Sequence, residues 1–284
     1  RARSTKQKAR LERYEEMKSI AAPEKDGVVE ISSVASRLGR TTVELERISK
    51  AYGEQVLIED FTYIFLKDDR VGFIGKNGCG KSTLMKIIMG KEQPDSGKVT
   101  IGQTVKLGYY AQEVGNETMN PGQRVIDYIR DTAEYIETNE GKITATRLLE
   151  KFLFAGEDQY GLIGKLSGGE KRRLYLCKIL MEAPNVLILD EPTNDMDIAT
   201  LRILENYLDS FPGIVIVVSH DRYFIEKFAE RIWLLEDGQI RDFKCGYAKY
   251  RSILEHEAAA KQAAPVSSPK PKNEKPRDGT KEND

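Results

Sequence analysis

The chain has 284 residues, enough to bury one substantial core, and its 44 Lys and Arg against 45 Asp and Glu give a formal net charge of −1. This balance excludes a chain that binds nucleic acid through overall positive charge, so any such role must be local. Three cysteines, Cys79, Cys177 and Cys245, cannot all pair with one another and predict a reducing, cytoplasmic environment. No apolar run approaches the roughly 20 residues that span a bilayer, and we expect no signal peptide and no direct membrane insertion. Because the first residue is Arg1, we expect a piece of a longer protein.

Residues 1–22 are predicted to form a basic helix outside the core. The segment lacks glycine and proline and is followed by Pro23. Residues 1–13 hold six basic side chains and one acidic, a local charge of +5. Four of these basic residues share one helix face at spacings of three and four and form a basic stripe: Arg3, Lys6, Arg10 and Arg13. The stripe is either a contact surface for RNA or an ordinary solvated helix face, and the sequence leaves both interpretations open.

The segment from residue 28 to residue 74 is predicted to consist of short β-strands. Alternation of apolar and polar residues over residues 43–48 predicts a half-exposed antiparallel strand. The last strand of the segment, Val71 to Ile74, runs directly into a glycine-rich loop. Further strands are expected at residues 28–31, 56–58 and 61–66.

The glycine-rich loop fits the pattern G-x-x-x-x-G-K-[ST], placed after a strand and before a helix as a phosphate-binding P-loop requires. Backbone N–H groups of such a loop and the positive end of the helix cradle a triphosphate. Lys81 is predicted to reach the β and γ oxygens, and the Ser82 hydroxyl to ligate Mg²⁺. The predicted nucleotide contacts are Gly75, Lys76, Asn77, Gly78, Cys79, Gly80, Lys81, Ser82 and Thr83.

Beyond the P-loop helix the pattern predicts an α/β core interrupted by helices. Residues 99–101 and 105–110 are expected as strands, and residues from about 122 to 180 as a helical insertion. Continuous apolar runs at residues 186–189 and 214–218 are typical of parallel strands covered on both faces. The last segment, 256–284, is expected to be a helix end followed by a disordered tail.

Two carboxylates follow the buried strand of residues 186–189. Asp190 and Glu191 lie where ligands of open α/β sheets bind, at the carboxyl end of a strand. Asp190 is predicted to position Mg²⁺, and Glu191 to polarise the attacking water as a general base. On its own, the segment would be an ordinary acidic turn.

A Ser-Gly-Gly-Glu turn, Ser167, Gly168, Gly169 and Glu170, precedes another predicted helix. Read alone, it is a helix cap with Ser167 as the N-cap, or a second anion site at a helix N-terminus. A P-loop, this turn and then a strand ending in two acids resemble the ABC ATPase superfamily over residues 28–255. The resemblance implies an ABC ATPase domain with a mixed β-sheet core, an antiparallel β subdomain and an α-helical subdomain.

The resemblance also implies roles for residues that would not be singled out by their local sequence. Tyr52 resembles the aromatic that stacks on adenine, although a Tyr before a turn is also a common structural residue. Gln112 resembles the glutamine that contacts Mg²⁺ or the attacking water. His220 resembles the histidine that contacts the γ-phosphate, its alternative being a surface turn. Residues 193–197 resemble the loop that communicates across the dimer.

In this superfamily the P-loop face of one domain closes on the Ser-Gly-Gly face of a second. One set of elements in this chain implies two half-sites and a partner ABC domain, either another copy or the missing N-terminal half of the same protein. The implied activity is hydrolysis of ATP with Mg²⁺, with Glu191, His220 and Gln112 as catalytic residues. The implied ligands of the metal are Ser82, Gln112 and Asp190.

The flanking sequence is similar to ABC-F proteins, particularly the Uup-like group, which are tandem ABC ATPases associated with ribosomes. Residues 1–22 would then be the end of the basic linker between two ABC domains, facing tRNA and ribosomal RNA, and residues 28–255 the second ABC domain. Met196 departs from the usual Leu, a change that conserves volume. The alternatives are the ATP-binding subunit of an ABC membrane transporter, which normally lacks such a helix, and a binding module whose ATP site turns over poorly.

Overall fold

The structure is a computed structural model that describes residues 39, 41–111, 119–138, 141–194 and 196–263. Several predicted features lie outside these residues. They are the basic helix of residues 1–22 with its stripe, the strand at residues 28–31, Gln112, Asp195 and the tail beyond residue 263.

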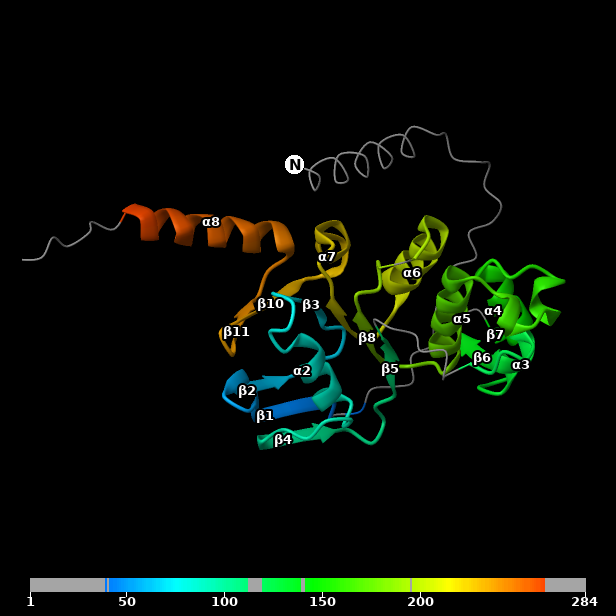
Figure 1. Cartoon of the computed structure of the whole chain (residues 1–284), viewed down its shortest axis with the longest axis horizontal. Coiled ribbons are helices and arrows are strands. Elements are labelled where there is room, and N and C mark those ends of the chain that lie inside the picture. Colours follow the sequence, from blue (N-terminus) through cyan, green and yellow to red (C-terminus); the bar gives the residue numbers. More distant parts are fainter. Residues whose placement is uncertain (1–38, 40, 112–118, 139–140, 195, 264–284) are drawn as a thin grey trace, which may run out of the picture.

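A six-stranded mixed sheet, in the order β11-β10-β3-β9-β8-β5, forms the centre of the domain (Figure 1). Its strands pair in parallel from β10 to β5, and β11 pairs antiparallel with β10. All residues of β8 and β9 are buried, which confirms the prediction of parallel strands covered on both faces. The strands are β5 (Leu107–Tyr110), β8 (Val186–Asp190), β9 (Ile214–Val218), β3 (Arg70–Gly75), β10 (Arg231–Glu236) and β11 (Gln239–Phe243).

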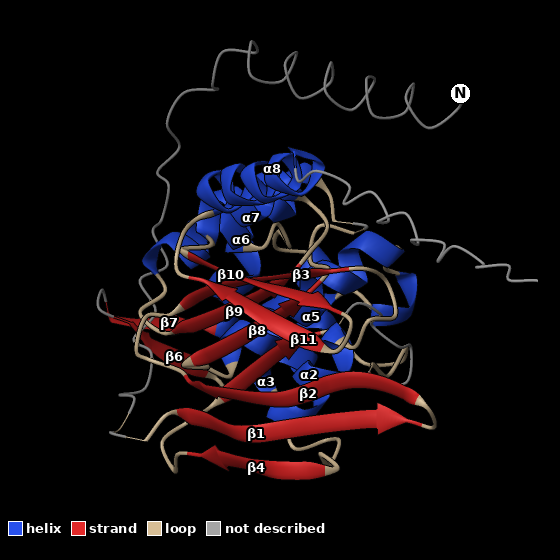
Figure 2. Ribbon diagram, turned by 90° about the vertical axis from the view of Figure 1, so that its left-hand side faces the viewer, coloured by secondary structure: helices blue, strands red, loops and turns tan. Residues whose placement is uncertain are grey.

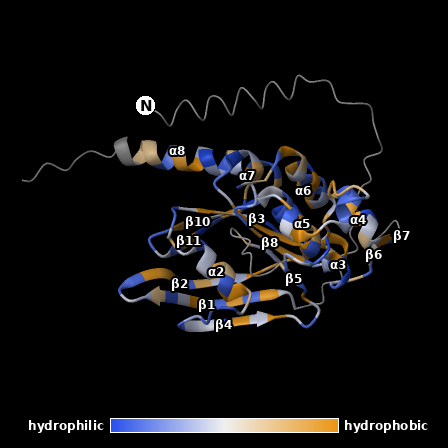
Figure 3. Ribbon diagram, turned by 45° about the vertical axis from the view of Figure 1, so that its right-hand side comes forward, coloured by the Kyte–Doolittle hydropathy of each residue, from blue (hydrophilic) through white to orange (hydrophobic). Residues whose placement is uncertain are grey.

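The two faces of this sheet carry different partners. Val186 and Ile188 of β8 pack with helix α2 (Lys81–Ile88), whereas Leu187 and Leu189 pack with helix α5 (Gly168–Met181). Side chains alternate between faces along a strand, so α2 and α5 lie on opposite faces of the sheet. In Figure 3, α5 carries both orange hydrophobic and blue hydrophilic segments, as expected for a helix with one face on a core.

A three-stranded antiparallel sheet, in the order β2-β1-β4, forms a separate layer below the central sheet (Figure 2). Its strands are β1 (Val43–Tyr52), β2 (Gln55–Ile64) and β4 (Ser96–Ile101). Trp233 of β10 is fully buried, and its ring centroid lies 5.0 Å from that of Phe61 and 4.7 Å from that of Tyr63. These aromatic contacts from β2 onto β10 hold the two sheets together.

The prediction of two separate strands at residues 56–58 and 61–66 was wrong. Residues 55–64 form one strand, β2, whose register against β1 is irregular. Asp60 has φ of 49° within this strand, and an irregularity of this kind changes the face on which the following apolar residues lie. The sequence pattern is therefore broken although the strand continues.

The expected helical insertion is only partly helical. It contains α3 (Val125–Arg130), α4 (Ala145–Lys151), α5 and the short 3₁₀ turns η2 (Asp158–Tyr160) and η3 (Ile163–Lys165). Between α3 and α4, however, β6 (Tyr135–Thr138) and β7 (Gly141–Thr144) form an antiparallel hairpin. Aromatic and β-branched residues favour strands, and Gly141 adopts φ of 115°, which other residues rarely do. The helical prediction for this stretch was wrong because these residues favour an antiparallel hairpin over a helix.

The described C-terminal part of the chain, after β8, contains three helices: α6 (Ile198–Ser210), α7 (Arg222–Phe228) and α8 (Tyr247–Ala263). In Figure 2 they lie on the side of the central sheet away from the antiparallel sheet. Tyr250 of α8 is buried against Ile225 of α7 and Leu234 of β10. The expected helix end after residue 255 is part of α8, which continues to Ala263.

Within the described ranges, no helix is both long enough and apolar enough to cross a membrane.

Candidate functional site

The P-loop connects β3 to α2 and depends on two glycines in left-handed conformations. Gly78 has φ of 76° and Gly80, the N-cap of α2, has φ of 117°. A Cβ atom on Gly80 would also lie 3.0 Å from Cβ of Leu57, so a larger residue there meets both strain and crowding. The loop thus brings consecutive backbone N–H groups to the start of a helix, the arrangement that binds phosphate.

Lys81 is buried inside this loop. Its Nζ donates hydrogen bonds to the carbonyl oxygens of Gly75 at 2.7 Å and of Lys76 at 2.8 Å. These bonds hold the ammonium group within the cradle. A phosphate oxygen is charged and is therefore a stronger acceptor for the same ammonium than a carbonyl.

At the carboxyl end of β8, the carboxylate of Asp190 lies beside the Ser82 hydroxyl of the P-loop helix, and both groups are of a kind that binds metal ions. Ser82 Oγ donates a hydrogen bond to Asp190 Oδ2 at 3.1 Å, and Tyr109 of β5 donates to the same oxygen at 3.1 Å. Hydroxyl and carboxylate oxygens are ligands that Mg²⁺ prefers. The described residues include no group of three or more His, Cys, Asp or Glu side chains able to hold a metal. A Mg²⁺ ion at this pair would therefore take its remaining ligands from water and the phosphates of a nucleotide, which is the usual mode for this ion.

Glu191 occupies the next position in an unusual backbone conformation. Its φ is 50°, and its backbone N–H donates to the carbonyl oxygen of Val218 at 2.7 Å. The residue is 6 % exposed, and burial raises the pKa of its carboxyl above the ordinary value. Non-glycine residues persist in left-handed conformations mainly where surrounding structure enforces them, often at functional sites.

His220 connects Glu191 to the P-loop. Its Nε2 lies 2.7 Å from Asn77 Oδ1 and 3.4 Å from Glu191 Oε1, and its backbone N–H donates to Glu191 Oε2 at 3.3 Å. Its side chain is half exposed. The structure thus brings together the P-loop, Asp190, Glu191 and His220.

Tyr52 lies at the end of β1, where its hydroxyl interacts with Thr83 in the first turn of the P-loop helix. Its side chain is 51 % exposed, and the Nζ of Lys50 lies 5.3 Å from its ring centroid. Lys50 in turn forms ion pairs with Glu92 and Asp95. The exposed ring is available for stacking.

The Ser-Gly-Gly-Glu turn forms the N-terminus of α5. Ser167 is the N-cap, and it exchanges hydrogen bonds with Glu170 in a capping box. The hydrogen bond from the Ser167 hydroxyl, together with that from its backbone N–H, lowers the pKa of the Glu170 carboxyl. A Cβ atom placed on Gly168 or Gly169 would meet nothing within 4 Å. These glycines leave the helix end open to another molecule.

The cap predicts a measurable loss of stability in Ser167→Ala. Removing the N-cap side chain takes away a partner of a backbone N–H at the helix start, so the free energy of unfolding should fall by about 1 kcal/mol. Chemical denaturation followed by circular dichroism measures the change. Ser252→Ala, on an exposed position of α8, is the matched control and should cause no loss. Equal stability of both variants would contradict the capping role.

Two arginines that the sequence analysis did not single out connect α5 to the loop after Glu191. Arg172 Nη1 donates to the carbonyl oxygen of Asn194 at 3.1 Å, and Arg173 pairs with Asp197 at 3.4 Å. Their position close behind the Ser-Gly-Gly-Glu turn, from which only Lys171 separates them, was the available signal. Tyr109 was also missed, because nothing in one sequence reveals that its hydroxyl meets Asp190.

Comparison with known proteins agrees with this geometry. Residues 58–194 match the family described as "ABC transporter". The chain is 47% identical over 267 residues to the "Uncharacterized ABC transporter ATP-binding protein YfmR" of Bacillus subtilis, covering 93% of this chain and 42% of that protein. It is 38% identical to the "Energy-dependent translational throttle protein EttA" of Escherichia coli K12, covering 93% and 48%. The EttA of Mycobacterium tuberculosis is 41% identical, with coverage of 82% and 42%.

The chain therefore spans about half the length of these relatives. Among solved structures, an ATP-binding subunit of an ABC transporter superposes with a TM-score of 0.63 at 19% identity, covering 76% of this chain and 94% of that one. The dimeric ATP-binding cassette MJ0796, bound to ADP and Pi, superposes with a TM-score of 0.57 at 23% identity, covering 72% and 100%. Fold, site and relatives agree that this chain contains an ABC ATPase domain, whose cofactors are ATP and Mg²⁺.

Proposed function

We propose that the chain is the second ABC domain of an ABC-F type protein of the Uup-like group, which acts in the cytoplasm on ribosomes through ATP-dependent clamp closure. The observation that supports this proposal most directly is the similarity to relatives named for a translational throttle, at 38% and 41% identity. The chain spans about half of those proteins, which leaves length for another ABC domain.

The active site is completed by a second ABC domain. In this chain the P-loop helix α2 and the helix α5 that Ser167 begins lie on opposite faces of the central sheet. The Ser-Gly-Gly end of α5 therefore serves a nucleotide held by the partner, and the partner's equivalent turn serves the nucleotide held here. A dimeric cassette among the structural relatives agrees with this arrangement.

The proposed hydrolysis gives each of these side chains a role. Lys81 holds the β and γ oxygens, Ser82 and Asp190 hold the Mg²⁺, and the partner's Ser-Gly-Gly turn adds N–H groups to the transferring phosphoryl. Glu191 accepts a proton from the attacking water while His220 keeps the carboxylate beside the P-loop. Gln112 adds a contact to the metal or the water, and Tyr52 stacks on adenine.

Under this proposal the chain consists of three parts. Residues 1–22 are the end of the basic linker, residues 28–255 the ATPase domain and residues 256–284 the helix end and tail. Within the linker, the basic stripe contacts ribosomal RNA or tRNA through phosphates. Its members are Arg3, Lys6, Arg10 and Arg13.

Ribosome co-sedimentation of the full-length protein tests the proposal. The Glu191→Gln protein in ATP should co-sediment, and binding should weaken steeply as salt increases. Adding Arg3→Glu and Lys6→Glu should weaken binding, whereas the same two reversals at Lys98 and Lys244, both exposed, should have little effect. No co-sedimentation, together with ATPase activity in a reconstituted membrane transporter, would favour the transporter alternative.

A further inference from the structure

We propose that Tyr109 is a positioning residue for Asp190, the carboxylate that this site offers to Mg²⁺. Tyr109 is the third residue of β5, and its Cα pairs with that of Ile188 on β8. Its side chain packs on the face of the sheet that carries the P-loop helix, whereas the neighbouring Tyr110 packs on the α5 face. The strand therefore presents Tyr109, and not Tyr110, to the nucleotide site.

Two hydroxyl groups converge on one carboxylate oxygen. Tyr109 and Ser82 each lie 3.1 Å from Asp190 Oδ2, and Asp190 is 2 % exposed. A serine hydroxyl can offer a lone pair to a cation and still donate its proton, so Tyr109 is a second donor to the same carboxylate oxygen beside Ser82. Hydrogen bonds to ligating carboxylates orient them and tune the metal.

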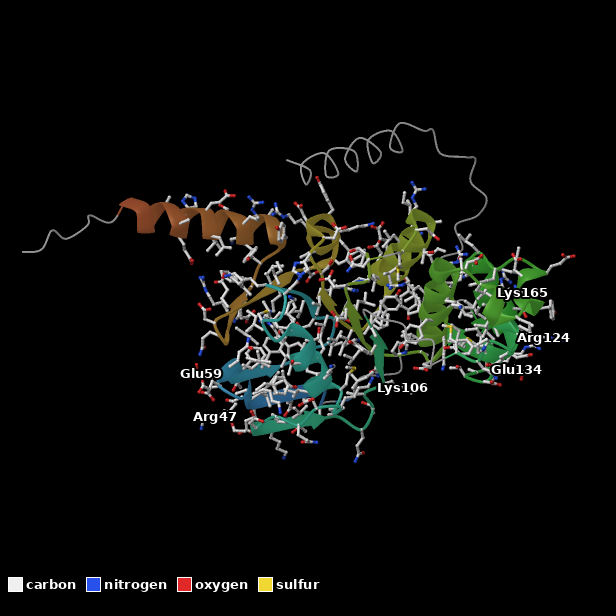
Figure 4. The ribbon with its side chains drawn as sticks, viewed as in Figure 1. Arg47, Glu59, Lys106, Arg124, Glu134 and Lys165 are labelled. Atoms are coloured by element: carbon white, nitrogen blue, oxygen red, sulfur yellow. The ribbon has the colours of Figure 1, made fainter. Side chains whose placement is uncertain are left out.

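Tyr109 is itself held in place. The start of β5 is fixed beside β8 because Asn185 accepts a hydrogen bond from the backbone N–H of Lys106, a residue labelled in Figure 4. The carbonyl oxygen of Tyr109 accepts a hydrogen bond from the Tyr175 hydroxyl of α5 at 3.4 Å. The Nζ of Lys91 lies 5.2 Å from the ring centroid of Tyr109. These contacts fix the strand and the ring together.

The hydrogen bond from the Tyr109 hydroxyl to Asp190 joins two neighbouring strands of the central sheet, β5 and β8. The proposed role of Tyr109 depends only on the nucleotide site, and it does not depend on the cellular target on which the domain acts.

Binding of a fluorescent ATP analogue at a series of free Mg²⁺ concentrations tests the role in Tyr109→Phe, which removes only the hydroxyl. In EDTA the variant should bind the analogue as the wild type does. The Mg²⁺ concentration that gives half of the metal effect should rise about tenfold, in the range seen when partners of metal ligands are removed. Tyr110→Phe, the same change on the other face of the strand, should leave this midpoint unchanged.

Three results would overturn the proposal. The first is an unchanged Mg²⁺ midpoint in Tyr109→Phe. The second is weaker binding in EDTA, because the hydroxyl would then shape the P-loop and not the metal carboxylate. The third is an equal shift in Tyr110→Phe. Binding of the analogue is measured on this chain alone, so the outcome is independent of ribosome co-sedimentation.

Discussion

Glu191→Gln should slow ATP hydrolysis by at least about a hundredfold and leave ATP binding close to that of the wild type. The substitution keeps the shape of a side chain that lies at the carboxyl end of β8 and is 6 % exposed. An amide cannot accept the proton that the attacking water loses, whereas it can still accept a hydrogen bond from the backbone N–H of His220. The loss should therefore appear in turnover and not in affinity.

The measurement is phosphate release at saturating ATP, in a protein that contains both ABC domains, beside the affinity for a fluorescent ATP analogue. Glu226→Gln, the same change on an exposed position of α7, is the control and should retain full turnover. Hydrolysis at the wild-type rate in Glu191→Gln would remove Glu191 from the role of general base. Loss of nucleotide affinity would instead assign it to the binding of ATP.

Much of the fold was predictable because its signals are local. The runs at residues 186–189 and 214–218 are apolar on every position, and such runs form strands buried on both faces. The hairpin of β6 and β7 could not be predicted in the same way, because its two strands of four residues each give only a short pattern between the helices α3 and α4. Strand β2 was divided in two because the backbone irregularity at Asp60 breaks the apolar pattern.

The residues of the candidate site also fall into two groups, those that a local motif reveals and those that only the folded structure brings together. Residues of the P-loop and the pair Asp190 and Glu191 belong to short motifs, so one sequence was enough to single them out. The contact of His220 with Asn77 joins residues 143 positions apart, and the contact of Tyr109 with Asp190 joins residues 81 apart. Such contacts depend on which strands are neighbours in the sheet, and the order β9-β8-β5 does not follow the chain. This is why Tyr109 carries no recognisable sequence signal.

Lys81→Ala should weaken ATP binding about a hundredfold. Hydrogen bonds to charged groups contribute about 1.5 to 3 kcal/mol, and about 2.7 kcal/mol corresponds to this change in affinity. Lys81 is 7 % exposed, so its ammonium acts in a region where water competes little. Without it, the carbonyl oxygens of Gly75 and Lys76 also lose their donor.

The comparison that isolates this effect is Lys86→Ala on the same helix. Lys86 is exposed, so its replacement removes the same charge from α2 and leaves the cradle intact. Titration of the fluorescent ATP analogue should give wild-type affinity for Lys86→Ala and a hundredfold weaker affinity for Lys81→Ala. An equal loss of affinity in the two variants would mean that the net charge of α2, and not the ammonium within the loop, holds the phosphates, and wild-type affinity in both would mean that neither lysine does.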